Sequence, residues 1–197
     1  MALLTAGGVL SCAGVVGGYA LTSTKSMSSG HMEPSLPVGS SMTFNLLATE
    51  ADRGDVVLFD GAAWGEQRLI VERVVAVGGD RIAYSPGDRT LTLNGKPLEE
   101  PYVLDGDPVA GSPGAFSVDV PEGRLFVLGD HRFDSADSRY RSADSEGGTI
   151  PLSAVKGSLL NDDDPLRTGL LATVATSVGL LLLGAVAGVA ARHSRRR

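Results

Sequence analysis

The sequence has a single cysteine, Cys12, which lies in an apolar stretch. One cysteine cannot form an intramolecular disulfide, so a fold held together by disulfide bonds is excluded. The ordinary role of such a residue is that of a small buried apolar side chain. Cysteine content therefore does not indicate whether the chain works in a reducing or an oxidising compartment.

The chain also lacks the excess of basic residues that binding to nucleic acid requires. Its formal net charge is -6, and residues 168–197 contain four arginines and no acidic residue. Residues 1–167 therefore hold 13 basic and 23 acidic residues and carry a charge of -10. Phosphate binding needs a basic face, so no nucleic acid is expected as a partner. The terminal arginines are instead typical of a membrane topology signal.

Two long segments, at about residues 2–21 and 168–191, lack charged side chains altogether. Each has roughly the 20 residues that span a bilayer. We expect an N-terminal transmembrane anchor at residues 1–22, a second transmembrane helix at 168–191 and a basic cytoplasmic tail at 192–197. This topology puts residues 23–167 outside the cytoplasm. A cleaved signal peptide is the alternative for the first segment, although no Lys or Arg precedes its apolar run.

Between these segments the sequence has no long amphipathic helix and no internal repeat, and its pattern is that of short strands. Asn94-Gly95 predicts a type I′ turn within a hairpin at residues 90–98. Residues 99–113 are rich in Pro and Gly and predict a surface loop. Runs rich in β-branched or apolar residues predict strands at 55–60, 68–77, 116–120, 124–128 and 155–160. We therefore expect a mostly β, antiparallel and partly barrel-like domain over residues 23–167.

Three sequence blocks within this domain carry a family resemblance. They are residues 28–39 (SSGHMEPSLPVG), 71–80 (VERVVAVGGD) and 128–139 (LGDHRFDSADSR). The third is the most specific, because a match across GD-x-R-x-x-S-A-D-S-R rarely arises by chance. The order and spacing of the blocks, just after an N-terminal apolar segment, resemble the bacterial type I signal peptidases. That family consists of membrane serine endopeptidases.

The resemblance implies a catalytic dyad whose two positions are both substituted in this chain. In the family a serine hydroxyl attacks the peptide carbonyl, and a buried neutral lysine accepts the hydroxyl proton. The serine position, between Gly30 and Met32, is occupied by His31. The lysine position, directly before Arg73, is occupied by Glu72.

The residues that support the dyad in the family have matches here. Ser29 matches the serine whose hydroxyl stabilises the oxyanion, and Ser135 matches the serine that orients the lysine amine. Asp137 and Arg139 match a structural ion pair near the site. The resemblance implies a cleft that binds an extended preprotein segment by strand addition. It implies no cofactor and no metal.

Loss of catalysis is the interpretation that these substitutions favour. His31 and Glu72 are expected to lie within hydrogen-bonding reach, where a carboxylate would favour the charged imidazolium, the wrong direction for a base. An active chain would cut signal peptides at the outer membrane face. An inactive chain would bind signal peptides or partner with an active signal peptidase. A structural membrane protein with a decayed site would bind no signal peptide.

Two further hypotheses keep chemistry at this site. In one, another serine attacks; Ser29 is nearest, with Ser28 and Ser35 further off. Two residues of extended backbone span about 6.6 Å, however, which is too far for Ser29 to replace the missing hydroxyl in place. In the other, His31, Glu72 and His131 bind a metal ion, since two histidines and a carboxylate are a known ligand set.

Overall fold

The computed structural model describes residues 21–48, 50–112, 114–144, 146–160 and Thr176. The chain divides into two units, and all of the β structure except the first two residues of the first strand belongs to the unit Thr24–Leu159. Apart from Leu21, Thr22 and Thr176, the expected spans and the basic tail lie outside the described residues, as does Cys12. Among the residues described, none belongs to a helix with the length and apolar character needed to cross a membrane.

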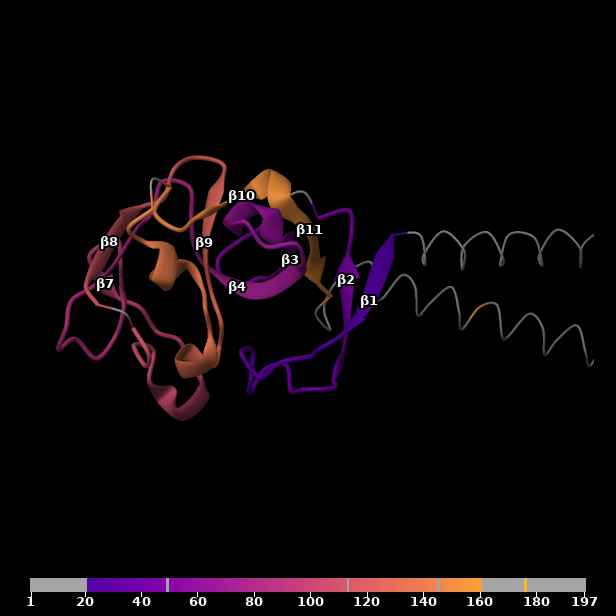
Figure 1. The fold of residues 1–197 in the computed structure, drawn as a ribbon, viewed down its shortest axis with the longest axis horizontal. Helices are drawn as coiled ribbons and strands as arrows, with labels where there is room; N and C mark the ends of the chain where they lie inside the picture. Colours follow the sequence, from indigo (N-terminus) through magenta and orange to yellow (C-terminus); the bar gives the residue numbers. More distant parts are fainter. Residues whose placement is uncertain (1–20, 49, 113, 145, 161–175, 177–197) are drawn as a thin grey trace, which may run out of the picture. The chain divides into compact units, whose positions relative to one another are not determined.

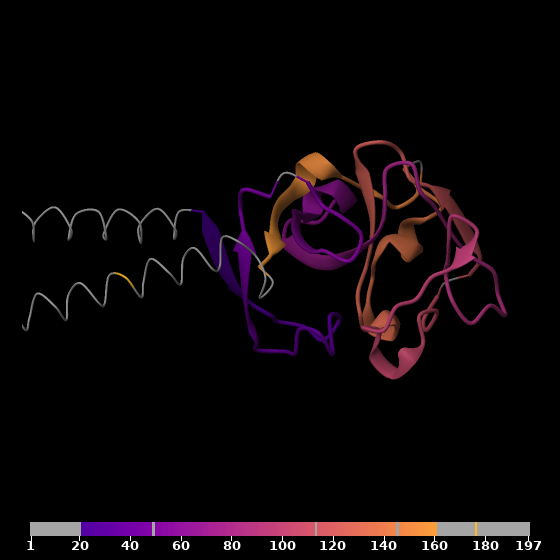
Figure 2. The same cartoon turned by 180° about the vertical axis from the view of Figure 1, so that it is seen from behind.

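The described residues form two sheets. The order of the seven-stranded sheet is β1-β2-β11-β3-β4-β9-β10, and that of the four-stranded sheet is β7-β6-β5-β8. Figure 1 shows β2, β11, β3, β4 and β9 following one another, and Figure 2 shows the same arrangement from behind. The strands are β1 Thr22–Ser26, β2 Ser41–Asn45, β3 Val56–Asp60, β4 Leu69–Val77, β5 Arg81–Tyr84, β6 Thr92–Leu93, β7 Lys96–Pro97, β8 Phe116–Asp119, β9 Arg124–Leu128, β10 Ile150–Pro151 and β11 Val155–Leu159.

The prediction of a mostly β, antiparallel domain is confirmed. The pairs from β2–β11 to β4–β9 and from β7–β6 to β5–β8 are all antiparallel. The predicted strand segments correspond to β3, β4, β8, β9 and β11. The predicted hairpin is β6–β7, and its turn residues Asn94 and Gly95 have φ angles of 54° and 77°, as a type I′ turn requires. The partly barrel-like character stays a prediction.

The central strands are buried on both faces. Val56 and Leu58 of β3 belong to one apolar cluster, whereas Val57 and Phe59 belong to another. This alternation follows from the two-residue period of a strand. It explains why β3 is a continuous apolar run rather than an alternating one. Strand β4 is similarly buried, and Glu72 lies in its middle.

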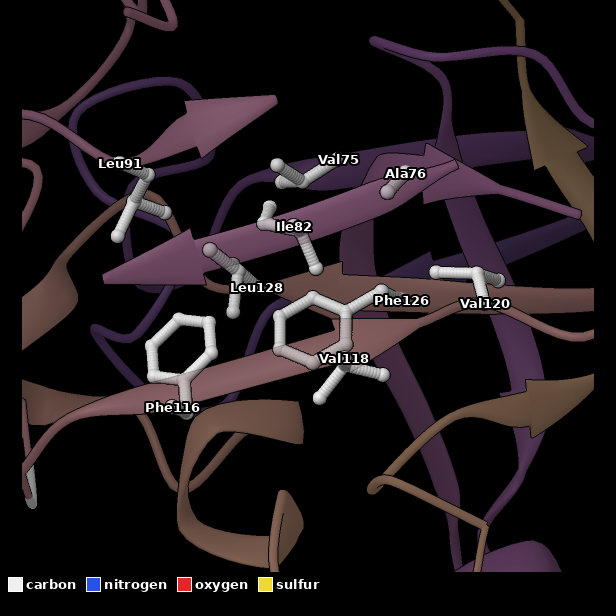
Figure 3. Packing of buried hydrophobic residues seen from close by; sticks show 9 residues of the cluster. All are labelled: Val75, Ala76, Ile82, Leu91, Phe116, Val118, Val120, Phe126 and Leu128. Atoms are coloured by element: carbon white, nitrogen blue, oxygen red, sulfur yellow. The ribbon is translucent and has the colours of Figure 1, made fainter. Parts of the chain in front are cut away.

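A third apolar cluster joins the two sheets, and Figure 3 shows its nine members. They come mainly from β4 and β9 of the larger sheet and from β5 and β8 of the smaller one. Phe116 and Phe126 stack with ring centroids 5.7 Å apart. The cluster consists of Val75, Ala76, Ile82, Leu91, Phe116, Val118, Val120, Phe126 and Leu128.

Short 3-10 helices lie in the connections between strands. One connection, residues 99–113, differs from the predicted surface loop, because Glu100 and Val103 are buried. Glu100 turns inward to pair with the buried Arg132. The helices are η1 Gly61–Trp64, η2 Leu104–Gly106, η3 Arg132–Asp134, η4 Ser138–Arg141 and η5 Leu152–Ala154.

Because Phe126 packs in the apolar cluster that joins the two sheets, we expect its truncation to destabilise the fold strongly. We expect Phe126→Ala to lower the free energy of unfolding by about 3–5 kcal/mol, because it removes a fully buried ring. Denaturant unfolding followed by the fluorescence of Trp64, the sole tryptophan, measures this change. The control is Phe133→Ala, since Phe133 is 76% exposed and its loss should cost less than about 0.5 kcal/mol. Equal costs for the two variants would contradict the assigned core.

Candidate active site

The segment that carries His31 is a closed loop between β1 and β2 (Figure 1). The Met27 N–H donates to the Ser40 carbonyl at 2.9 Å, and the Gly39 N–H donates to the Met27 carbonyl at 2.8 Å. Met32 is fully buried and packs in the cluster that includes Met42 and Phe44. Because Met32 is buried in this cluster, it holds the neighbouring His31 against the sheet.

Arg73 connects the three sequence blocks. Its Nε and Nη2 donate to Asp130 Oδ1 and Oδ2 at 2.7 and 2.5 Å, a bidentate ion pair between β4 and the segment after β9. The same Nη2 lies 3.1 Å from Ser35 Oγ in the first block. Asp130 is fully buried, so the pair is shielded from solvent. Blocks that are far apart in the sequence thus meet at one guanidinium.

The third block also touches His31 directly through the backbone. The His131 N–H donates to the His31 carbonyl at 2.9 Å. Gly129 permits this approach, because a Cβ there would lie 2.6 Å from the His31 carbonyl oxygen and 2.5 Å from Ser135 Oγ. Such distances are shorter than any normal contact, so a glycine is required at this position.

The structure brings His31 and Glu72 together but does not hydrogen-bond them. His31 Nε2 lies 3.8 Å from Glu72 Oε1, with side chains 16% and 4% exposed. The expectation of hydrogen-bonding reach is therefore wrong by a few tenths of an ångström. The reason is a competing acceptor on the same strand, since Nε2 lies 2.8 Å from the Val71 carbonyl oxygen.

Burial controls the charge of Glu72. Desolvation raises the pKa of its carboxyl well above the ordinary value, and the charges of Asp137 and Asp130 raise it further, whereas Arg139 and Arg132 lower it. The direction is toward the neutral acid. A carboxyl shifted in this direction attracts a positive charge less than a fully ionised carboxylate does, which weakens the basis for the expected attraction between Glu72 and a charged imidazole.

The polar atoms around Glu72 are incompletely paired. Within the described residues, Glu72 Oε2 and Ser135 Oγ are buried and have no hydrogen-bond partner. Ser135 is the residue that matches the lysine-orienting serine. Unpaired buried polar atoms are costly, each by about 1–3 kcal/mol. The two oxygens belong to the residues that match the family's catalytic base and its orienting serine.

Ser29 meets the ring of His31 from the other side. Ser29 Oγ lies 2.8 Å from His31 Nδ1, and Ser29 is exposed to solvent. With Nε2 directed at the Val71 carbonyl, each ring nitrogen of His31 has a partner. The closest partners of the His31 ring are thus the Ser29 hydroxyl and the Val71 backbone carbonyl, and Glu72 lies farther away.

The expected ion pair of Asp137 and Arg139 is present. Arg139 Nε and Nη2 each lie 2.9 Å from an Asp137 oxygen, and both side chains are fully buried. Arg139 also donates to the carbonyls of Ala110 and Arg132. These contacts tie the third block to the preceding loop.

Sequence reasoning missed two contributors to the site. The Val71 carbonyl that binds His31 is a backbone group, so no residue type could have indicated it. The buried pair Glu100–Arg132, with oxygens and nitrogens 2.5 Å apart at the closest contact, was also missed. Glu100 lies in a segment rich in Pro and Gly that predicts a surface loop, so the sequence does not indicate that Glu100 is buried against Arg132.

A cavity of about 150 Å³ opens beside these groups. Ser29, His31 and Val71 contribute to its wall, together with the apolar Leu58 and Ile70. Two basic residues, Lys25 and Arg68, also line it, and no acidic residue does so among those described. The cavity thus offers an apolar floor, a hydroxyl–imidazole pair and positive charge.

The hypothesis of a metal site at His31, Glu72 and His131 is not supported. Over the described ranges, no group of three or more His, Cys, Asp or Glu side chains is placed to hold a metal ion. His131 approaches His31 through its backbone N–H, whereas its buried Nδ1 has no partner within the described residues.

The buried Glu72 predicts a specific dependence of stability on pH. A raised pKa in the folded state stabilises the fold below the unfolded-state pKa, about 4.3, and this contribution is lost as pH rises through the folded-state pKa. Glu72→Gln cannot ionise. We therefore expect the wild type to lose stability relative to Glu72→Gln as pH rises above about 4.3, by up to about 1.4 kcal/mol per pH unit.

Denaturant unfolding of both proteins across the pH range measures this difference. The matched control is Glu99→Gln, which alters an exposed glutamate. The control should keep a constant difference from the wild type. A constant difference for Glu72→Gln as well would contradict the assigned burial.

Comparison with known proteins agrees with the block resemblance. Residues 1–160 match the family described as "Signal peptidase, peptidase S26". A probable signal peptidase I of Mycobacterium leprae is 40% identical over an alignment of 119 residues, and the match covers 50% of this chain and 40% of that protein. A signal peptidase I of Bacillus licheniformis is 38% identical over an alignment of 97 residues, and the match covers 46% of this chain and 50% of that protein.

A solved structure is also similar in sequence. The crystal structure of a signal peptidase I from Enterococcus faecalis V583 has 27% identity and a TM-score of 0.43, and the match covers 56% of this chain and 97% of that one. The chain spans half or less of the length of the two curated relatives named above. The family match over residues 1–160 places this chain in the signal peptidase family, peptidase S26.

Proposed function

We propose that this chain binds the signal-peptide region of secreted preproteins in the cavity beside His31, and that it is impaired in the serine-type endopeptidase reaction of its family. Family membership supports the substrate class. The cavity supports the proposed location of peptide binding, because its apolar residues Leu58 and Ile70 suit the small side chains near a cleavage site.

One observation carries the impairment, namely the burial of Glu72 at the position of the family's general base. In its neutral form, which burial favours, a carboxyl group already holds its proton and cannot take the one that the family's neutral lysine accepts. Ser135, the partner of the absent amine, has no hydrogen-bond partner among the described residues. Lys25 lines the cavity but is exposed, and a lysine acts as a general base only when burial favours its neutral form.

The proposal includes a location at the cell membrane. The apolar segments 1–22 and 168–191 are the two spans, the tail 192–197 is cytoplasmic, and the domain 23–167 is extracytoplasmic. This arrangement places the cavity where preproteins emerge. The cavity then meets a signal peptide at the outer face of the bilayer.

A binding and cleavage experiment tests both parts of the proposal. The full chain, purified in detergent, is mixed with a fluorescent signal peptide that carries an Ala-x-Ala cleavage site, and anisotropy and mass spectrometry report binding and cleavage. The wild type should bind the peptide. His31→Ser combined with Glu72→Lys should cleave it at least about 100-fold faster than the wild type, because a positioned general base contributes that much or more.

Two results would count against the proposal. Absence of peptide binding would favour a structural membrane protein with a decayed site. Equal cleavage by the wild type and the double variant would show that the dyad positions are not the cause of impairment. Glu99→Lys is the charge-matched control at an exposed site and should leave binding and cleavage unchanged.

A further inference from the structure

The hydrogen bonds of His31 define its tautomer. Nε2 lies 2.8 Å from the Val71 carbonyl oxygen, which can only accept a hydrogen bond. In the neutral imidazole the proton is therefore on Nε2, and Nδ1 carries the lone pair. Ser29 Oγ, 2.8 Å from Nδ1, then donates its hydroxyl proton to that nitrogen.

This arrangement has the three parts of an activated nucleophile. A hydroxyl lies within hydrogen-bonding reach of a base, and a third group orients the base. Here the third group is the backbone of β4 instead of a carboxylate. Glu72 Oε1 lies 3.8 Å from Nε2, farther than the Val71 carbonyl oxygen, so the backbone is the closer partner of this nitrogen.

The surroundings of Ser29 allow a substrate to reach it. Ser29 is exposed and lines the cavity together with His31. Arg68 and Lys25 also line the cavity, and Arg68 is paired with Glu66 at 2.6 Å. Lys25 is thus the basic residue that favours the negative charge that develops on a carbonyl oxygen under attack. The hydroxyl is accessible and shares the cavity with this basic residue.

We propose that Ser29 is a nucleophile and that His31 Nδ1 is its general base, so that the cavity supports acyl transfer without the family's dyad. The acyl group comes from an extended peptide, and this choice of substrate rests on the proposed function. In this reaction Ser29 attacks from its own position and does not need to reach that of the missing serine. His31, which occupies the position of the missing serine, lies within hydrogen-bonding distance of Ser29 and acts as its base.

The reaction balances with these groups and water alone. As Ser29 Oγ bonds to the carbonyl carbon, its proton passes to His31 Nδ1. The carbon–nitrogen bond breaks, and the leaving amine takes the proton from Nδ1. Water then attacks the acyl carbon and gives a proton to Nδ1, and Ser29 Oγ leaves and recovers that proton.

A fluorophosphonate probe tests this proposal without a peptide substrate. Attack by a serine hydroxyl forms an oxygen–phosphorus bond and releases fluoride, and mass spectrometry locates the modified residue. The full chain in detergent should be labelled at Ser29. Ser29→Ala should lose the labelling, whereas Ser41→Ala, which changes an exposed serine of β2, should keep it.

Chemical rescue separates a base from a structural contact. His31→Ala should be labelled about 100-fold or more slowly than the wild type. Free imidazole should raise the labelling rate of His31→Ala but not that of Ser29→Ala. An absence of labelling in the wild type, labelling at Ser28 or Ser35 instead, or full labelling of His31→Ala without imidazole would each overturn the proposal.

Binding of the fluorescent signal peptide, measured on the same samples, keeps the two proposals distinguishable. Peptide binding without labelling at Ser29 overturns only the nucleophile assignment. Labelling at Ser29 without peptide binding overturns only the proposed substrate. Retained peptide binding by His31→Ala would also show that its slow labelling does not result from unfolding.

Discussion

The bidentate ion pair between Arg73 and Asp130 determines how the site is assembled. Arg73 follows Glu72 in β4, and Asp130 precedes His131, whose N–H binds the His31 carbonyl. The guanidinium also reaches Ser35 in the loop that carries His31. Because Asp130 is fully buried, loss of Arg73 would leave an uncompensated charge in the interior. The pair thus helps to hold His31 and Glu72 near one another, together with the contacts of His31 to the Val71 carbonyl and the His131 N–H.

Within that frame, the two substituted positions have different consequences. Glu72 is buried, and this burial raises the pKa of its carboxyl. Ser135 Oγ has no hydrogen-bond partner among the described residues. His31 lies nearer the surface, where the Val71 carbonyl and the Ser29 hydroxyl satisfy both ring nitrogens. The position that the resemblance assigns to the family's base thus holds a buried acid, whereas the nucleophile position holds an imidazole that is hydrogen-bonded to a hydroxyl.

Much of the fold could be predicted from local sequence, because the central strands are apolar and the hairpin turn needs Asn94-Gly95. Strand β1, with the sequence TSTKS, was not predicted, since its polar residues resemble a loop and only pairing in the sheet makes it a strand. Strand β10 has two residues and no pattern of its own. Glu100 was missed for a related reason, because its burial depends on Arg132, which lies far along the chain.

By itself the sequence determined the family and the antiparallel β domain, because each follows from residue types in a recognisable order, and it predicted His31 and Glu72 as the two substituted positions. It also indicated the apolar segments and the basic tail. Only the tertiary structure decided which atoms His31 contacts and in which direction burial shifts the pKa of the Glu72 carboxyl. The physical reason is that hydrogen-bond partners and desolvation are set by groups distant in sequence, here the Val71 carbonyl and the packed interior around β4. A residue type indicates which chemistry a side chain can perform, and its surroundings decide which of those reactions it favours.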